Sequence, residues 1–173
     1  MNKNSIKILV QTALALAIVT ICTMVFTVPI PGTQGYVNLG DTMIFTFAII
    51  LGKKRGALIG GLGAALADIL LGAVIYAPAT LIIKALEGFL CGLIYEKIGE
   101  SNKVVGTVLG CLVGAFTMAF GYFAYDSILY GVGAAAGYII FNSIQGGGSI
   151  LLALPLSNIL SKTVKRLEIN KVA

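Results

Sequence analysis

The sequence contains no histidine and no tryptophan, and only 11% of its 173 residues are charged. Without histidine, the usual imidazole base of many enzymes and the commonest metal ligand are both excluded. Soluble domains carry about 25% charged residues, whereas here 58% of the residues are hydrophobic. The composition therefore excludes a soluble globular protein and predicts an integral membrane protein.

Cysteine is also scarce. Cys22, Cys91 and Cys111 lie in separate apolar segments without the spacing of metal ligands, and we interpret them as small packed side chains. We therefore expect no metal site and no bound cofactor. The sequence also lacks a phosphate-binding loop of the form G-x-x-x-x-G-K-[ST]. If the chain takes part in active transport, we expect a partner to supply the energy.

What the sequence does have is long apolar runs, and about 20 apolar residues suffice to cross a bilayer. These runs predict an all-α integral membrane fold with six transmembrane helices in a single domain, residues 1–173. We expect the spans near residues 8–26, 37–52, 57–76, 79–95, 104–125 and 136–161. Pro29 and Pro31 predict a loop or broken element after the first run, and residues 127–135 are expected to form a loop or a short surface helix.

The basic residues predict the orientation of these spans. Eleven of the twelve lysines and arginines precede span one, follow span six, or lie between spans two and three or four and five. All of these places share one face of a six-span protein, and the positive-inside rule predicts that this face and both termini are cytoplasmic. The net charge of +5 then reflects topology, and we expect no nucleic-acid partner. The first run is longer than a signal-peptide core, so we expect it to be retained.

Lys84 is the exception, because it lies in the apolar run "LIIKALEG" with Glu87 one turn later on the same helix face. A charge at the bilayer centre costs about 2.5–3.5 kcal/mol, and an i,i+3 ion pair returns only about 0.2–0.5 kcal/mol. Mutual pairing alone is therefore a weak reason to keep both charges. A packed pair that ties helices together is the alternative to a ligand site.

Other polar side chains lie at the same depth as Lys84, at the outer ends of spans two, three and six. The inner halves of the spans show almost none, whereas a pore needs polar residues through the whole membrane thickness. This asymmetry predicts an outward-facing binding site for a small polar solute that contains a ring. The candidate substrate-binding residues are Tyr36, Asn38, Asp41, Lys84, Glu87, Asn142 and Gln145.

Several motifs follow one another in a characteristic order: "ALALA", "GYVNLGD", "ILGKKRGALIGGLGAALADILLG", "APATLIIKALEGFLCGLIYEKIG" and "FNSIQGGG". In this order and spacing they resemble the substrate-binding S components of energy-coupling factor (ECF) vitamin transporters. The resemblance covers nearly the whole chain. It implies a six-helix membrane protein that binds one vitamin or vitamin precursor from the outside.

The resemblance also implies partners, namely a transmembrane T component and two ATP-binding-cassette ATPases that drive toppling of the S component. Ala13 and Ala17 match the A-x-x-x-A pattern that contacts the T component, although such pairs also occur in any alanine-rich membrane helix. Within the family, the sequence is most similar to the branch for hydroxymethylpyrimidine, a thiamin precursor, or pyridoxine-like compounds. Pantothenate and a queuosine precursor stay open as ligands.

The residues alone also leave two other classes of membrane protein open. One is a stand-alone channel or facilitator for a small polar solute. The other is an intramembrane enzyme that uses Asp41 and Asp68 as paired acids. Because no nucleophile and base pair stands out in the sequence, we expect no enzyme.

Overall fold

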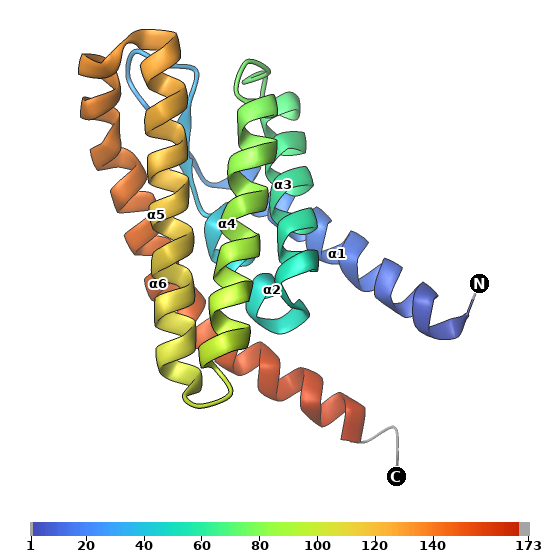
Figure 1. The fold of residues 1–173 in the computed structure, drawn as a ribbon. Helices are drawn as coiled ribbons and strands as arrows, with labels where there is room; N and C mark the ends of the chain where they lie inside the picture. The colour runs from blue at the N-terminus through green and yellow to red at the C-terminus, as the bar shows by residue number, and fades with distance from the viewer. Residues whose placement is uncertain (1, 170–173) are drawn as a thin grey trace.

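The computed structural model describes residues 2–169, with side chains for residues 2 and 4–163. Six helices and a short hairpin follow one another along the chain (Figure 1). Their bounds are α1 (Lys3–Val25), β1 (Thr27–Pro29), β2 (Tyr36–Asn38), α2 (Gly40–Leu51), α3 (Lys53–Leu70), α4 (Ala77–Ile98), α5 (Lys103–Tyr130) and α6 (Val132–Ile169).

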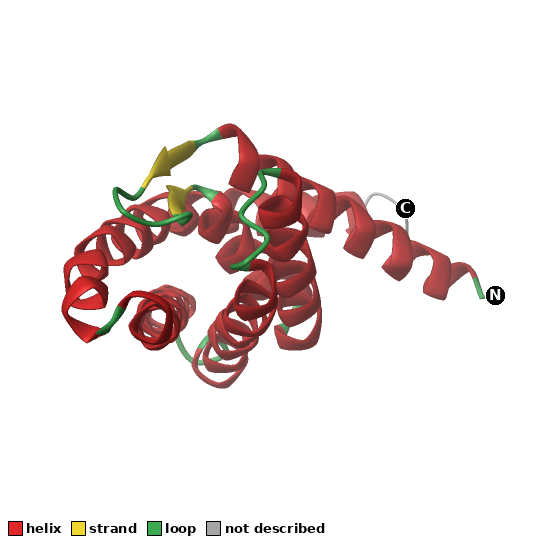
Figure 2. Cartoon of the chain, turned by 90° about the horizontal axis from the view of Figure 1, so that it is seen from above, coloured by secondary structure: helices red, strands yellow, loops and turns green. Residues whose placement is uncertain are grey.

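The helices α3, α4, α5 and α6 pack side by side in chain order, while α2 contacts α1, α3, α4 and α6. Seen from above, the helices surround the middle of the bundle and the hairpin lies at its margin (Figure 2). Helix α2 is therefore the element around which the others assemble. Its first residues follow the hairpin directly, so the start of α2 marks the hairpin end of the bundle.

Within the described part of the chain, four helices are long and apolar enough to cross a bilayer, over Asn4–Val25, Ala77–Ile98, Lys103–Tyr130 and Val132–Thr163. Helix α2 is apolar but has 12 residues, or about 18 Å at 1.5 Å per residue, less than the roughly 30 Å of a hydrocarbon core. The prediction of six helices in a membrane protein is confirmed. By length and composition, four of the six meet the criterion for crossing the membrane.

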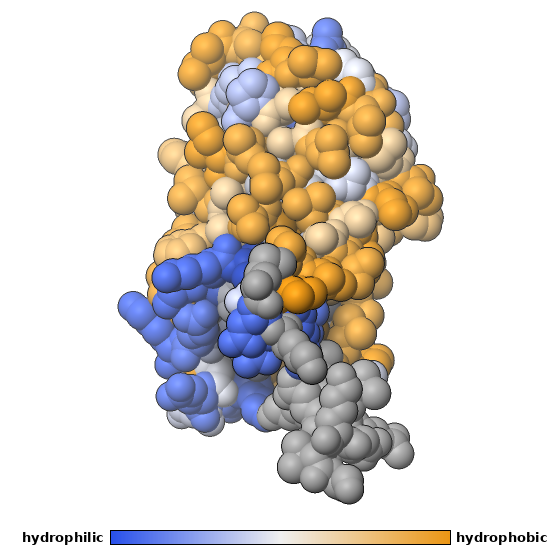
Figure 3. All heavy atoms as spheres, turned by 90° about the vertical axis from the view of Figure 1, so that its right-hand side faces the viewer, coloured by the Kyte–Doolittle hydropathy of each residue, from blue (hydrophilic) through white to orange (hydrophobic). Residues whose placement is uncertain are grey.

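The surface has the polarity that a bilayer requires. Large apolar side chains point outward, among them Phe116 with 72% and Ile128 with 82% of its surface exposed. Hydrophobic residues cover the upper part of the face in Figure 3, and hydrophilic residues gather at the lower end. Exposed apolar surface of this extent is stable only against lipid or a partner protein.

The turn between the last two helices differs from the prediction. The loop or surface helix expected at 127–135 is wrong, because α5 continues to Tyr130 and α6 begins at Val132. Gly131 separates the two helices with φ +86°, a backbone conformation that glycine adopts without a steric penalty. A single residue thus replaces the expected connection, and Asp126 lies in the last turns of α5.

The segment after α1 is broken, as the prolines predict, but it is more regular than a loop. Strands β1 and β2 pair antiparallel, with Thr27 opposite Asn38 and Pro29 opposite Tyr36. The third span also ends earlier than predicted, since α3 stops at Leu70 and a turn leads to α4. Both features lie at the same end of the bundle, where the hairpin approaches the ends of the long helices (Figure 1).

A tightly packed apolar core surrounds the second half of α2. Phe45, Ala48 and Ile49 form a buried apolar cluster with Cys91 and Cys111, so the interpretation of these two cysteines as packed core residues is confirmed. Helices α3 and α4 approach so closely that a Cβ on Gly88 would lie 2.4 Å from the carbonyl oxygen of Gly56. The second half of α2 therefore lies in a dry core, and polar groups gather at its first half.

Candidate functional site

A small polar cavity lies between the hairpin and the ends of α3, α4, α5 and α6. Its volume is about 30 Å³, roughly enough for one or two water molecules. The lining combines aromatic rings, hydroxyls, amides and carboxylates. Its polar members include Tyr36, Asn38, Asp68, Tyr76, Thr80, Tyr122, Asp126, Asn142 and Gln145.

Beside this lining lies a buried ion triad formed by Asp41, Lys84 and Glu87. The Lys84 ammonium donates a hydrogen bond to Asp41 Oδ1 and lies 2.9 Å from Glu87 Oε2, an ion pair whose angle is not that of a hydrogen bond. All three side chains are at most 2% exposed. The ammonium also lies 5.6 Å from the centre of the Tyr122 ring. Two carboxylates thus hold the cation in place from α2 and α4.

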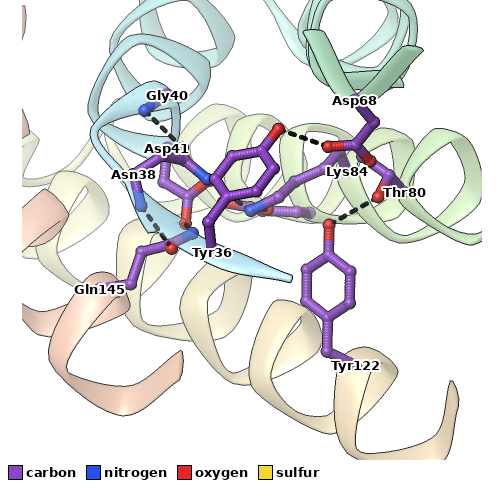
Figure 4. Close-up of polar contacts among 10 residues, drawn as sticks. Tyr36, Asn38, Gly40, Asp41, Asp68, Thr80, Lys84, Tyr122 and Gln145 are labelled. Atoms are coloured by element: carbon purple, nitrogen blue, oxygen red, sulfur yellow. Dashed lines mark hydrogen bonds and ion pairs between the residues drawn. The ribbon is translucent and has the colours of Figure 1, made fainter. Parts of the chain in front are cut away.

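Gln145 connects this triad to the hairpin (Figure 4). Its side-chain nitrogen donates to Asp41 Oδ2 over 2.8 Å, and its oxygen accepts from the Asn38 backbone N–H over 2.8 Å. The Asn38 side chain in turn accepts a hydrogen bond from the backbone N–H of Gly40 over 2.8 Å. The Gln145 side chain therefore joins β2, α2 and α6, and both its donor and its acceptor have partners within the protein.

Asp68, from the last turn of α3, faces the hairpin. The Tyr36 hydroxyl donates to Asp68 Oδ1 over 2.5 Å. Burial, and next the nearby carboxylate, raise the pKa of Tyr36, which keeps this donor protonated at neutral pH. The hydroxyls of Thr80 and Tyr122 lie 2.9 Å apart beside Asp68 (Figure 4). These contacts close the cavity on the α3 and α4 side.

Asp126 forms a second carboxylate contact at the end of α5 that lies beside the hairpin. The Tyr76 hydroxyl donates to Asp126 Oδ1 over 2.7 Å, and the Tyr76 ring packs against the rings of Tyr122 and Tyr125 with centroids 6.3 and 5.5 Å away. The residue was not among the predicted site residues. An aspartate inside "FAYDSILY" could have been recognised as an outer-end polar group if the fifth helix had been extended to residue 130.

The structure brings the seven predicted substrate-binding residues into one connected region. Four of them, Tyr36, Asn38, Asn142 and Gln145, line the cavity. The other three form the ion triad and do not belong to the lining. Contact of any of the seven with a substrate stays a prediction.

The two alanines predicted to dock a partner lie on the outside of α1. Ala13 and Ala17 are exposed, whereas Ala15 and Val19 on the opposite side are buried against the bundle. They therefore lie on a face that is free to meet another protein. Among the described residues, no group of three or more histidine, cysteine, aspartate or glutamate side chains could hold a metal ion.

Comparison with known proteins identifies the family. A family model described as the S component of ECF-type riboflavin transporters matches residues 3–162. The chain belongs to this family of ECF-transporter S components. The motif resemblance is thereby confirmed, and the S component is a multi-pass protein of the plasma membrane. Its family consists of substrate-specificity subunits of transporters, not of enzymes.

Two relatives of this S component are similar over most of their length. The chain is 31% identical over 167 residues to the thiamine precursor transporter HmpT of Lactococcus lactis subsp. cremoris strain MG1363, an alignment that covers 96% of this chain and 92% of that protein. It is 35% identical over 146 residues to an uncharacterized protein in the gap 3′ region of Pyrococcus woesei, covering 84% and 96% of the two chains.

Proposed function

We propose that this S component binds a small vitamin precursor, a hydroxymethylpyrimidine or pyridoxine-like heterocycle, from the outside and delivers it inward. The observation that carries this proposal is the cavity, in which Asn142, Gln145 and Asp68 meet the tyrosine rings of the hairpin and α5. Amide and carboxylate groups fix the orientation of a nitrogen heterocycle, and aromatic rings provide area for stacking.

The small size of the cavity favours a small ligand over the tricyclic riboflavin named in the family's description. Ligand pockets usually have about 300–1,000 Å³, and this cavity has about 30 Å³. A single six-membered ring needs a smaller opening than three fused rings. The relative that matches 96% of the chain is named a thiamine precursor transporter, which also favours a small heterocycle.

Entry of even a small ring requires movement, and the hairpin is the element that can move. It is held by Gln145 through the Asn38 backbone and by Tyr36 through Asp68. These few polar contacts hold the hairpin less firmly than the extensive side-chain packing that holds the long helices together. We therefore expect the hairpin to swing away from α6 when the ligand enters.

The proposed orientation places the cavity on the outside. Lys53, Lys54 and Arg55 lie where α2 turns into α3, and Lys97 lies at the end of α4. Figure 1 shows these two turns at the end of the bundle opposite the hairpin. By the positive-inside rule the basic end is cytoplasmic, which puts both termini of the six-helix domain inside.

Delivery inward depends on partners in this proposal. A transmembrane T component would contact the exposed Ala13 and Ala17 face of α1, because small residues let membrane helices approach closely. Two ATP-binding-cassette ATPases would supply the energy. The stand-alone facilitator is not favoured by membership in the ECF family.

Binding by the purified chain in detergent tests the proposal. We expect 4-amino-5-hydroxymethyl-2-methylpyrimidine or pyridoxine to raise the unfolding temperature, and riboflavin to have a smaller effect. Asn142→Ala should weaken binding, whereas Ser143→Ala, an exposed neighbour whose hydroxyl donates to the Ile139 carbonyl oxygen, should not. If no heterocycle stabilises the protein, the proposal is wrong. Ligand uptake by liposomes that hold this chain alone would instead support a facilitator.

A further inference from the structure

The cavity of the proposed site is bordered by anions. Among the described residues, the buried ionisable side chains include four carboxylates, Asp41, Asp68, Glu87 and Asp126, and the ammonium of Lys84. Asp68 and Asp126 line the cavity, and no lysine or arginine does. The Lys84 ammonium is engaged by Asp41 and Glu87. A ligand in this cavity therefore meets carboxylates without a free cation.

Asp68 has one carboxylate oxygen without a well-formed hydrogen bond in the part of the chain that the structure describes. The side chain is 5% exposed, and its Oδ1 accepts the Tyr36 hydroxyl over 2.5 Å. Its Oδ2 is buried and has no hydrogen bond of good geometry among the described residues. The Thr80 hydroxyl is close enough to interact with this carboxylate, and it also lies 2.9 Å from the Tyr122 hydroxyl, which competes for its proton. In Figure 4 the Tyr36 hydroxyl points at the Asp68 carboxylate, and the Tyr122 hydroxyl points toward Thr80 next to it.

An unpaired carboxylate oxygen in a buried cavity is unfavourable until a donor reaches it. An N–H group on the ligand would satisfy it with a charge-assisted hydrogen bond. A phosphate group would bring a further negative charge next to Asp68 and Asp126 in a medium of low dielectric, where like charges repel strongly.

We propose that Asp68 is a specificity-determining residue that accepts a hydrogen bond from an amino group on the ring of the ligand. The ligand is then a neutral or cationic amino heterocycle, and its phosphate ester is rejected. This inference rests on the proposed function, because it names the ligand chemistry of the same cavity.

Three matched probes test it on the unaltered protein in nanodiscs by isothermal titration calorimetry. The first is 4-amino-5-hydroxymethyl-2-methylpyrimidine, the second has a methyl group in place of the amine, and the third is the phosphate monoester of the first. Loss of a hydrogen bond to a charged group should weaken the methyl probe about 10- to 100-fold. The phosphate ester should bind at least as weakly as the methyl probe.

Asp68→Asn tests the residue directly. The asparagine oxygen can still accept the Tyr36 hydroxyl, and its NH₂ group then faces the ligand in place of an acceptor. The variant should lose about 10- to 100-fold in affinity for the amino probe and should no longer distinguish it from the methyl probe. Glu100→Gln, an exposed residue at the opposite end of the bundle, is the control and should bind all probes like the original chain.

Equal binding of the amino and methyl probes, or tight binding of the phosphate ester, overturns the inference while the proposed function stands. Binding of pyridoxine without binding of the aminopyrimidine does the same. If neither these probes nor any other vitamin precursor binds, the proposed function itself is wrong and the inference falls with it. If Asp68→Asn does not fold, the three-probe comparison on the unaltered protein decides the matter alone.

Discussion

Replacing Lys84 by methionine should destabilise the protein strongly, because the substitution removes the cation of the buried ion triad and keeps the volume of its side chain. Asp41 and Glu87 would then face each other while both are fully buried. The Gln145 amide still donates to Asp41, but Glu87 has the Lys84 ammonium as its ion partner. The substitution therefore leaves two buried carboxylates close together without a cation between them.

Removing one partner of a buried ion pair costs about 3–5 kcal/mol. We therefore expect Lys84→Met to lower the free energy of unfolding by about 3–5 kcal/mol.

Unfolding in mixed micelles with increasing sodium dodecyl sulfate, followed by tyrosine fluorescence or circular dichroism, measures this loss. Lys54→Met is the matched control, since Lys54 is exposed at the basic end, and it should change stability by less than about 0.5 kcal/mol. A triple variant that adds Asp41→Asn and Glu87→Gln removes all three charges. It should recover most of the loss, because a neutral replacement of a whole buried ion network is often tolerated.

A loss below about 1 kcal/mol for Lys84→Met would contradict the structural role of the triad. If the variant keeps its stability but no longer binds the heterocycle, Lys84 contacts the ligand directly. That result would support the sequence-based prediction that Lys84 binds the substrate.

The remaining predictions concern the outside of α1 and the packing of α3 against α4. Ala13→Leu with Ala17→Leu should reduce co-purification of the T component and ATPases, while heterocycle binding is kept. The control is Ala124→Leu, at an exposed alanine on α5, which should leave the complex intact. An unchanged complex in the double variant would show that α1 is not the docking face. Gly88→Ala should cost about 1–3 kcal/mol by overpacking against a backbone carbonyl of α3, whereas Gly147→Ala has open space and should be neutral or slightly stabilising. Equal stability of these two glycine variants would contradict the close approach of α3 and α4.

The helical membrane fold could be predicted from the sequence because it depends on local properties. Apolar runs of sufficient length must form helices in lipid, where backbone groups have no water to bind. The error at residues 127–135 has the same local origin. A single glycine with φ +86° suffices to reverse the chain. A loop is expected there because residues 127–161 are too long for one span, whereas α6 is a single helix of 38 residues.

The candidate site could be located from the sequence but its internal order could not. Depth along each span placed Asp41, Lys84 and Gln145 at one level, and the structure joins them by direct contacts. Sequence gives the depth of a side chain, but not which way it points around the helix relative to its neighbours. The division into a cavity lining and an ion triad is therefore a result of packing.

The sequence by itself determined the membrane environment, the helical secondary structure and the end of the bundle at which polar groups gather, because each follows from the residues of one segment. Only the tertiary structure decided that Lys84 is held by Asp41 and Glu87, and that, within the described chain, one Asp68 oxygen beside the cavity lacks a well-formed hydrogen bond. These contacts join residues more than 30 positions apart or depend on the exact rotation of packed helices. Such relations are set by how side chains interlock in three dimensions, and no single segment contains them.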